Sequence, residues 1–210
     1  MLESPLSRYA GSIALVAGVL VVASRVVILL TTPTDIEALQ VYVLSVTHAI
    51  NSVVSITAYA LLAVALLAIY ERIARPAGTL GVIGLGAAII GTVFMAGDWW
   101  YEAFAVPRMA EVAPEAMETF VGGRLLIGGL TSFVLFGIGW ILFGAASIRA
   151  NVYPRATSVA ILVGGLLSAV PIGVVYLAGG VTLGLAFVWL GVGMLRTTTA
   201  SSGAGEPALV

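Results

Sequence analysis

The stretch AGSIALVAGVLVVASRVVILLT, from Ala10 to Thr31, is apolar almost throughout and carries a single charge, at Arg25. A helix needs about 20 mostly apolar residues, at a rise of about 1.5 Å each, to cross the hydrocarbon layer of a bilayer. The stretch is long enough and therefore predicts a membrane-spanning helix. No convincing small-residue cleavage site follows the apolar run, so we expect a retained first span and not a signal peptide.

The whole chain has the composition of a membrane protein. Of its 210 residues, 60% are hydrophobic and 9% are charged, and the mean hydropathy is +1.13. One soluble core of this size could not bury so much apolar surface. We predict an all-α fold with one six-helix transmembrane domain over residues 1–196, followed by a small, polar tail, residues 197–210, that we expect to be disordered. The expected spans are residues 10–31, 41–70, 79–104, 119–147, 156–176 and 179–196.

Basic residues predict the orientation of these spans. Lys and Arg collect in the cytoplasmic connections of membrane proteins. Six arginines fall on one side of the expected helices: Arg8, Arg72, Arg75, Arg149, Arg155 and Arg196. The opposite connections are acidic, so we expect both termini in the cytoplasm. All nine basic residues are Arg, which together with abundant Ala, Gly and Val is typical of a GC-rich bacterial genome and favours a multi-pass protein of the bacterial inner membrane.

Local motifs predict several helix ends. The stretch TDIE, Thr34 to Glu37, matches a capping box, in which the Thr hydroxyl and the Glu carboxylate bind the first free amides of the second helix. A short outer turn is expected at Gly179–Gly180, which leaves Pro171 inside the fifth span and would suit a broken helix beside a site.

The first, third and fifth spans open with similar sequences, at Arg8, Arg75 and Pro154. Three repeated helical hairpins would produce this pattern, and so would the concentration of arginine on one side of an Ala/Gly-rich chain. Pairs of small residues four apart, such as Ala14 with Gly18 and Gly180 with Gly184, favour close helix packing.

One segment carries a family resemblance. The stretch GWILFGAASIRANVYPRATSVAILVGGLL, from Gly139 to Leu167, ends one helix with an aromatic residue and glycines and begins the next after a Pro–Arg turn. It resembles a pattern in uncharacterised six-helix bacterial inner-membrane proteins. The resemblance covers the fourth and fifth spans, and it implies a fold without assigning a role to any residue.

Polar residues inside the apolar runs are the candidates for a functional site, because an ionisable group in a span is costly. Since successive helices alternate in direction, the candidates converge on one depth in the outer half of the bundle. The predicted ligand-binding residues are Arg25, His48, Asn51, Ser55, Tyr59, Asp98, Glu102 and Arg124. Two arginines and two carboxylates would balance, and we expect Arg25 to lie within ion-pair distance of a carboxylate, Asp98 rather than Glu102.

The second span carries the strongest single signal. Its polar residues are spaced i, i+3, i+4, i+7 and i+11 and therefore share one helix face: His48, Asn51, Ser52, Ser55 and Tyr59. Such a stripe should face a helix seam or a hydrated cavity and not lipid. After Asp98, the residues Trp99, Trp100 and Tyr101 match an outer aromatic belt.

Composition also excludes several classes of site. The absence of Cys excludes disulfides, iron–sulfur clusters and thiolate catalysis, and a single His excludes multi-histidine zinc and bis-histidine haem. We expect no metal and no cofactor. A net charge of −1 without a basic block argues against a nucleic-acid partner.

Three functions fit what is left. The first is binding or transport of a small amphiphile or lipid through a polar pocket in the outer half of the bundle. The second is a membrane enzyme acting on a lipid or isoprenoid, with Asp98 or Glu102 as general acid or base. The third is a non-catalytic subunit of a membrane complex, in which the polar residues hold helices together. The sequence leaves the oligomeric state open, a homo-oligomer included.

Overall fold

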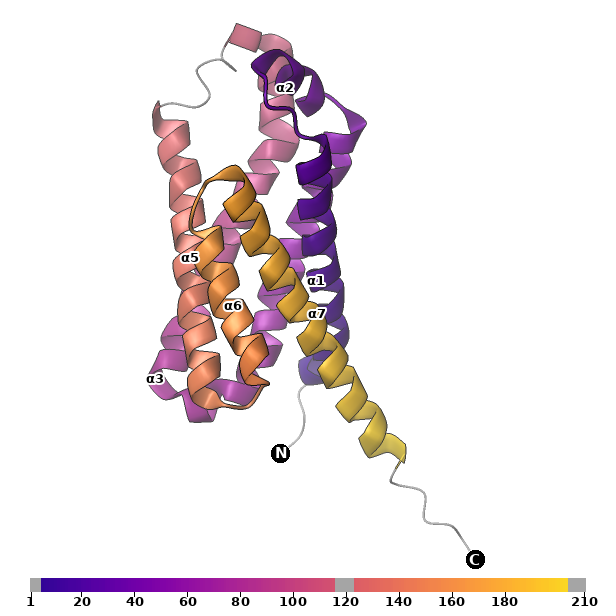
Figure 1. Cartoon of the computed structure of the whole chain (residues 1–210), viewed down its shortest axis with the longest axis vertical. Helices are drawn as coiled ribbons and strands as arrows, with labels where there is room; N and C mark the ends of the chain where they lie inside the picture. The colour runs from indigo at the N-terminus through magenta and orange to yellow at the C-terminus, as the bar shows by residue number, and fades with distance from the viewer. Residues whose placement is uncertain (1–4, 116–122, 204–210) are drawn as a thin grey trace, which may run out of the picture.

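The computed structural model describes residues 5–115 and 123–203, which fold as a helical bundle (Figure 1). Over these residues there are six helices and no strand. The helices are α1 (Pro5–Thr31), α2 (Ile36–Val43), α3 (Val46–Val112), α5 (Gly123–Ala150), α6 (Arg155–Ser168) and α7 (Gly173–Gly203). Four of them, α1, α3, α5 and α7, are long and apolar enough to cross a membrane. The all-helical prediction is confirmed, and α6, with 14 residues, is the short member.

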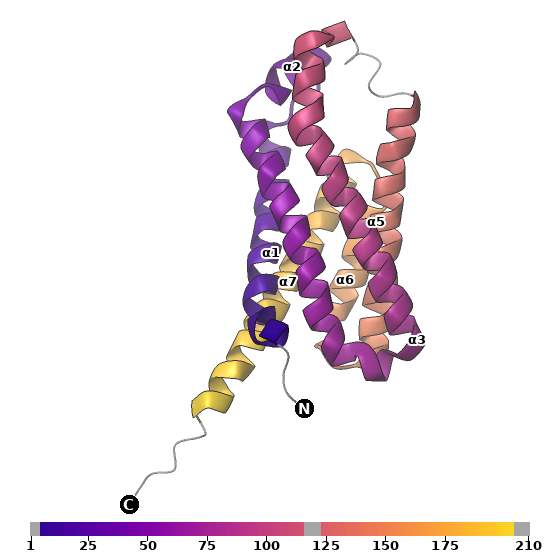
Figure 2. The ribbon, with the colours of Figure 1, turned by 180° about the vertical axis from the view of Figure 1, so that it is seen from behind.

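The long helix α3 contains two of the predicted spans. Its backbone leaves helical geometry at Gly78, where φ is 59° and ψ is −143°. This region of backbone space is open essentially to glycine alone. Pro76, which cannot donate a backbone hydrogen bond, further weakens the helix there. The chain therefore folds back, and the two arms, residues 46–77 and 79–112, run side by side in opposite directions (Figure 2).

The helices form a closed ring in chain order. α1 packs on α3, α3 on α5, α5 on α6 and α6 on α7, and α7 returns to pack on α1. Short connections between neighbouring helices favour this up-and-down arrangement. The three-hairpin repeat stays a prediction, because the ring alone does not distinguish repeated hairpins from independent helices.

Glycines allow the helices to approach closely. A Cβ atom at Gly18 would lie 2.5 Å from the carbonyl oxygen of Gly184 on α7, and one at Gly144 would lie 2.6 Å from the backbone nitrogen of Leu162 on α6. Real side chains do not tolerate such distances, so these positions must be small. The predicted role of Gly18 and Gly184 in helix packing is confirmed.

The predicted end of the fifth span is wrong. α6 stops at Ser168, and the turn to α7 contains Pro171, whereas Gly179 and Gly180 lie within α7. Proline removes a backbone donor and restricts the residue before it, which ends α6. The two glycines serve packing instead, since a Cβ at Gly179 would lie 2.5 Å from the backbone nitrogen of Ser168. α7 also continues to Gly203, into the stretch expected to be disordered, and the rest of that stretch lies outside the described residues.

The start of the second span also differs from its prediction. Asp35, one residue after the predicted Thr34, caps α2, and its carboxylate accepts a hydrogen bond of 2.8 Å from the amide of Ala38. α2 ends after two turns, and Ser45 begins α3 by accepting a bond of 3.1 Å from the amide of His48. Asp and Ser are preferred caps because their side-chain oxygens satisfy free amides of the first turn.

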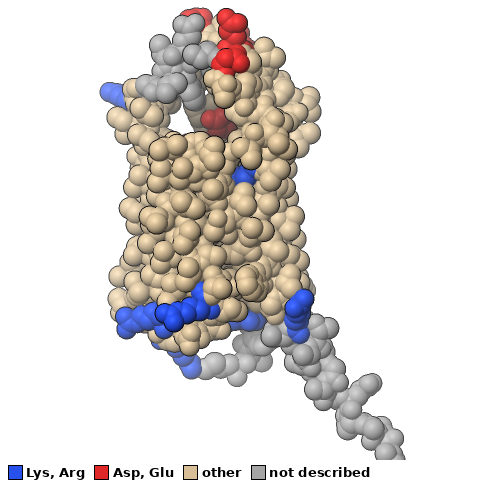
Figure 3. All heavy atoms as spheres, in the orientation of Figure 1, with Lys and Arg blue, Asp and Glu red and all other residues tan. Residues whose placement is uncertain are grey.

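Charged side chains separate to the two ends of the bundle (Figure 3). Arginines surround the end that holds the α3 fold-back and the α5–α6 connection, among them Arg72, Arg75, Arg149 and Arg155. The other end carries acidic residues before α2 and at the end of α3, among them Asp35, Glu37 and Glu111. On the face that Figure 3 shows, the surface between the ends carries almost no charge. We call them the basic end and the acidic end.

Candidate functional site

A large cavity opens near the acidic end of the bundle. Its volume is about 910 Å³, and its walls come from α1, the second arm of α3, α5 and the start of α7. Figure 3 shows an opening at this end with acidic atoms in its depth. Most lining residues are apolar, aromatic or glycine, and the charged ones are Asp98, Glu102 and Arg124.

A smaller cavity of about 230 Å³ lies behind the first, between α1, α2 and both arms of α3. Its polar lining includes His48 and Asn51. Three residues line both cavities: Ile28, Trp99 and Glu102. These side chains therefore form the partition between the two cavities.

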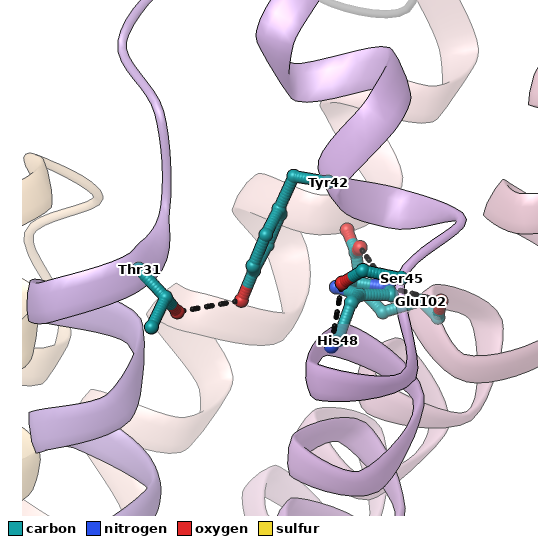
Figure 4. A network of polar contacts seen from close by, with 5 residues as sticks. All are labelled: Thr31, Tyr42, Ser45, His48 and Glu102. Atoms are coloured by element: carbon teal, nitrogen blue, oxygen red, sulfur yellow. Dashed lines mark hydrogen bonds and ion pairs between the residues drawn. The ribbon is translucent and has the colours of Figure 1, made fainter.

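His48 connects the two arms of α3 beside this partition (Figure 4). Its Nε2 lies 3.0 Å from the backbone carbonyl oxygen of Glu102 and 4.0 Å from one carboxylate oxygen of the same residue. Because a carbonyl can only accept, Nε2 carries the proton in this arrangement. The ring of Tyr42 packs edge-on against His48, with 5.3 Å between ring centres. The Tyr42 hydroxyl accepts a hydrogen bond of 3.2 Å from the Thr31 hydroxyl on α1. The network joins α1, α2 and α3 at the acidic end.

The polar stripe of the predicted second span faces inward, which confirms that prediction. All five of its residues, His48, Asn51, Ser52, Ser55 and Tyr59, are at most 5% exposed. The stripe serves both as a cavity wall and as a seam. His48 and Asn51 line the smaller cavity, while Ser52, Ser55 and Tyr59 pack deeper between helices.

Arg25 does not have the predicted carboxylate partner. Among the described residues, no carboxylate lies within 4.0 Å of its guanidinium, which is buried at 1% exposure. One terminal nitrogen donates a hydrogen bond of 2.8 Å to the Tyr59 hydroxyl, and the other two nitrogens, Nε and Nη1, have no partner. The guanidinium carbon instead lies 4.8 Å from the ring centre of Trp99, 4.9 Å from that of Tyr176 and 5.7 Å from that of Tyr59. Aromatic faces attract cations, so these three rings form a cage around Arg25.

The cage depends on a glycine of α7. A Cβ atom at Gly180 would lie 2.9 to 3.1 Å from the Cγ, Cδ and Nε atoms of Arg25. Any larger residue at this position would displace the arginine stem. The glycine expected to form a turn is therefore the position that admits Arg25.

The predicted site residues divide into three places. Asp98, Glu102 and Arg124 line the large cavity, with Arg124 exposed at its rim. His48 and Asn51 line the smaller one. Arg25, Ser55 and Tyr59 line neither. The sequence indicates the depth of a residue in the bundle but not which neighbouring helix its side chain meets. Residues predicted at one depth therefore line different cavities, or none.

Sequence reasoning missed two members of the site. Trp99, expected in an outer aromatic belt, turns inward and contacts both cavities and Arg25, whereas Trp100 is exposed in agreement with a belt. Tyr176 was expected to end the fifth span on the outer side, but it lies in the first turn of α7, where its ring contacts Arg25. The described residues include no group of three or more His, Asp or Glu placed to hold a metal ion.

Comparisons with known proteins supply no relative. No protein-family model matches the chain, and no curated protein or solved structure matches it either. The resemblance noted for residues 139–167 stays a prediction. The functional argument therefore rests on the geometry of the two cavities.

Proposed function

We propose that this chain is an integral protein of the bacterial inner membrane and that its large cavity binds a small amphiphile. Six passes result when the two arms of α3 are counted separately and α6 is included. The concentration of arginines at the basic end supports an orientation with that end in the cytoplasm. Both the start of α1 and the end of α7 are then cytoplasmic, and the cavity opens in the outer half.

Cysteine labelling tests this orientation, because the chain contains no native Cys. Thr79 follows the fold-back of α3 and Val112 ends the same helix, and both are exposed. In intact cells, an impermeant thiol reagent added outside should label Val112→Cys and not Thr79→Cys. Labelling of both, or of Thr79→Cys alone, would contradict the orientation.

The cavity itself is the observation that carries the functional proposal. Its volume of about 910 Å³ falls within the range of about 300–1,000 Å³ that is typical of small-molecule sites. An apolar wall with a few charged groups on one side matches a molecule with an alkyl part and a polar head. Exposed residues such as Phe94 and Leu126 belong to the lining, so the cavity reaches the apolar outer surface.

Filling the cavity should abolish binding without unfolding the protein. A Cβ atom at Gly128 would meet no atom within 4 Å, so Gly128→Trp places an indole into or across the chamber. Gly86 has the same open surroundings but does not line the cavity, which makes Gly86→Trp the matched control. Native mass spectrometry of protein released from maltoside micelles measures bound 12-carbon amphiphiles. Equal binding by both variants and the native protein would overturn the proposal.

A membrane enzyme is the second candidate, because two carboxylates share the cavity and one of them, Glu102, lies beside His48. Positioned carboxyl groups can serve as general acid and base. Incubation with a bacterial lipid extract and mass analysis of the lipids separates the alternatives. A lipid whose mass changes with the native protein, but not with Asp98→Asn or Glu102→Gln, indicates catalysis, whereas bound lipid of unchanged mass indicates binding.

A further inference from the structure

We propose that the amphiphile bound in the large cavity has a cationic head, an amine or a quaternary ammonium group, held by Asp98 and Glu102. This inference rests on the proposed function and adds the class of ligand. Charge complementarity between the cavity wall and the head carries it.

The two carboxylates lie on one face of α3, because residues four apart in a helix are neighbours. Both line the large cavity. When both groups are ionised their negative charges repel each other, and partial burial strengthens the repulsion. A cation between them removes the repulsion and gives each carboxylate a partner.

Asp98 lacks such a partner within the protein. Among the described residues, no cation lies within 4.0 Å of its carboxylate, and no side chain forms an ion pair with it. The segment 116–122, AMETFVG, contains no basic residue that could supply one. Among the described residues, the ion-pair partner of Glu102 is His48, with 4.0 Å between Nε2 and a carboxylate oxygen.

Of the two nearby arginines, Arg25 is bound within the protein and Arg124 is exposed. Arg25 lines neither cavity and is bound by Tyr59 and three rings. Arg124 is exposed at the rim, where solvent reduces the effect of its charge. The deep part of the chamber is therefore acidic.

Aromatic rings complete a site for a cation. Five line the cavity, those of Phe94, Trp99, Tyr101, Phe133 and Tyr176. Rings beside carboxylates are the usual receptors of quaternary ammonium groups. The same wall already binds one cation in this way, since Trp99 and Tyr176 both contact Arg25.

Three amphiphiles with the same 12-carbon alkyl tail test the inference: dodecyltrimethylammonium, dodecylphosphocholine and tridecanoate. Their equal tails cancel the apolar contribution, so differences in affinity report the head. Native mass spectrometric titration should give an affinity about tenfold higher for the ammonium than for tridecanoate. Asp98→Asn should remove most of this preference. Glu111→Gln, which deletes an exposed carboxylate at the same end outside the cavity, should leave it unchanged.

The outcomes separate the two proposals. If all three amphiphiles bind equally and Gly128→Trp abolishes that binding, the cavity binds amphiphiles but the cationic head is wrong. Preference for tridecanoate, or a preference for the ammonium that survives Asp98→Asn together with Glu102→Gln, also overturns the inference. If none binds, the proposed function fails.

Discussion

Between α3 and α5, the glycines of the basic half and those of the acidic half of the bundle do opposite things. Toward the basic end, Gly84, Gly91 and Gly139 bring α3 and α5 into contact, and a Cβ on any of them would strike the backbone of the facing helix. Toward the acidic end, Gly97 and Gly128 face each other's helix across a cavity, with nothing within 4 Å of where a Cβ would be. The two helices thus touch in one half and diverge in the other.

This difference shows how a bundle of small residues can enclose a site. Where two helices approach, glycine permits close contact. Where they separate, glycine has no side chain to fill the space between them, and a cavity remains. The ribbon shows α5 separating from α3 toward the acidic end (Figure 2). One half of the molecule therefore fixes the helix pair, and the other half can hold a ligand.

The largest expected effect on stability comes from adding a methyl group in the basic half, where α3 and α5 touch. Gly139→Ala should lower the free energy of unfolding by about 3 kcal/mol, because overpacking forces backbone shifts. Gly128→Ala, at an open and exposed helical position, should instead stabilise the protein by about 0.5–1 kcal/mol. Melting temperatures of both variants in one detergent check the contrast. Similar losses for the two would show that the halves are not packed differently.

Glycine has a third role at the fold-back of α3, where it supplies conformation and not space. Gly78→Ala should cost about 1–3 kcal/mol, because φ of 59° with ψ of −143° is strained for any side chain. Gly86→Ala, at an exposed helical position, should instead stabilise the protein by about 0.5–1 kcal/mol. Thermal unfolding of the pair measures the difference, and a neutral Gly78→Ala would mean that the fold-back adopts another backbone geometry.

The cage of Arg25 lies in the acidic half, beside the cavity wall formed by Trp99 and Tyr176, and its single hydrogen bond should be measurable. Tyr59→Phe leaves the guanidinium without a hydrogen-bond acceptor and should cost about 1–3 kcal/mol. In an Arg25→Met background the same change should cost much less. Unfolding experiments on the two singles and the double variant give this coupling, and equal costs in both backgrounds would exclude the bond.

The smallest expected effect is the energetic coupling between Arg25, in the cage, and Asp98, in the cavity wall. Because Arg25 and Asp98 form no ion pair, the losses from Arg25→Leu and Asp98→Leu should add to within about 0.5 kcal/mol. Melting temperatures of the singles and the double variant test this. If the double variant is clearly more stable than the sum of the two single losses predicts, Arg25 and Asp98 do form the ion pair that the sequence suggested.

Much of the helical pattern could be predicted, because runs of apolar residues report directly on helix length. The pair Asp98 and Glu102 was also predictable, since their spacing alone places them on one face. The partner of Arg25 was not, because the choice between a carboxylate and aromatic rings depends on how α1, α3 and α7 rotate against one another. The turn at Pro171 was missed because Gly179–Gly180 looks like a turn in a sequence where glycine mostly serves packing.

The shortness of α6 has a consequence for the surrounding bilayer. Fourteen residues span about 21 Å, against a hydrocarbon thickness of about 30 Å. The turn between α6 and α7 therefore ends below the level that the neighbouring helices reach, as Figure 1 shows. Its exposed side chains, Ile172 and Val174, are apolar. In the membrane orientation proposed above, thinning of the bilayer beside this hairpin would lower the lipid head groups toward Pro171 and Gly173, at the margin of the large cavity.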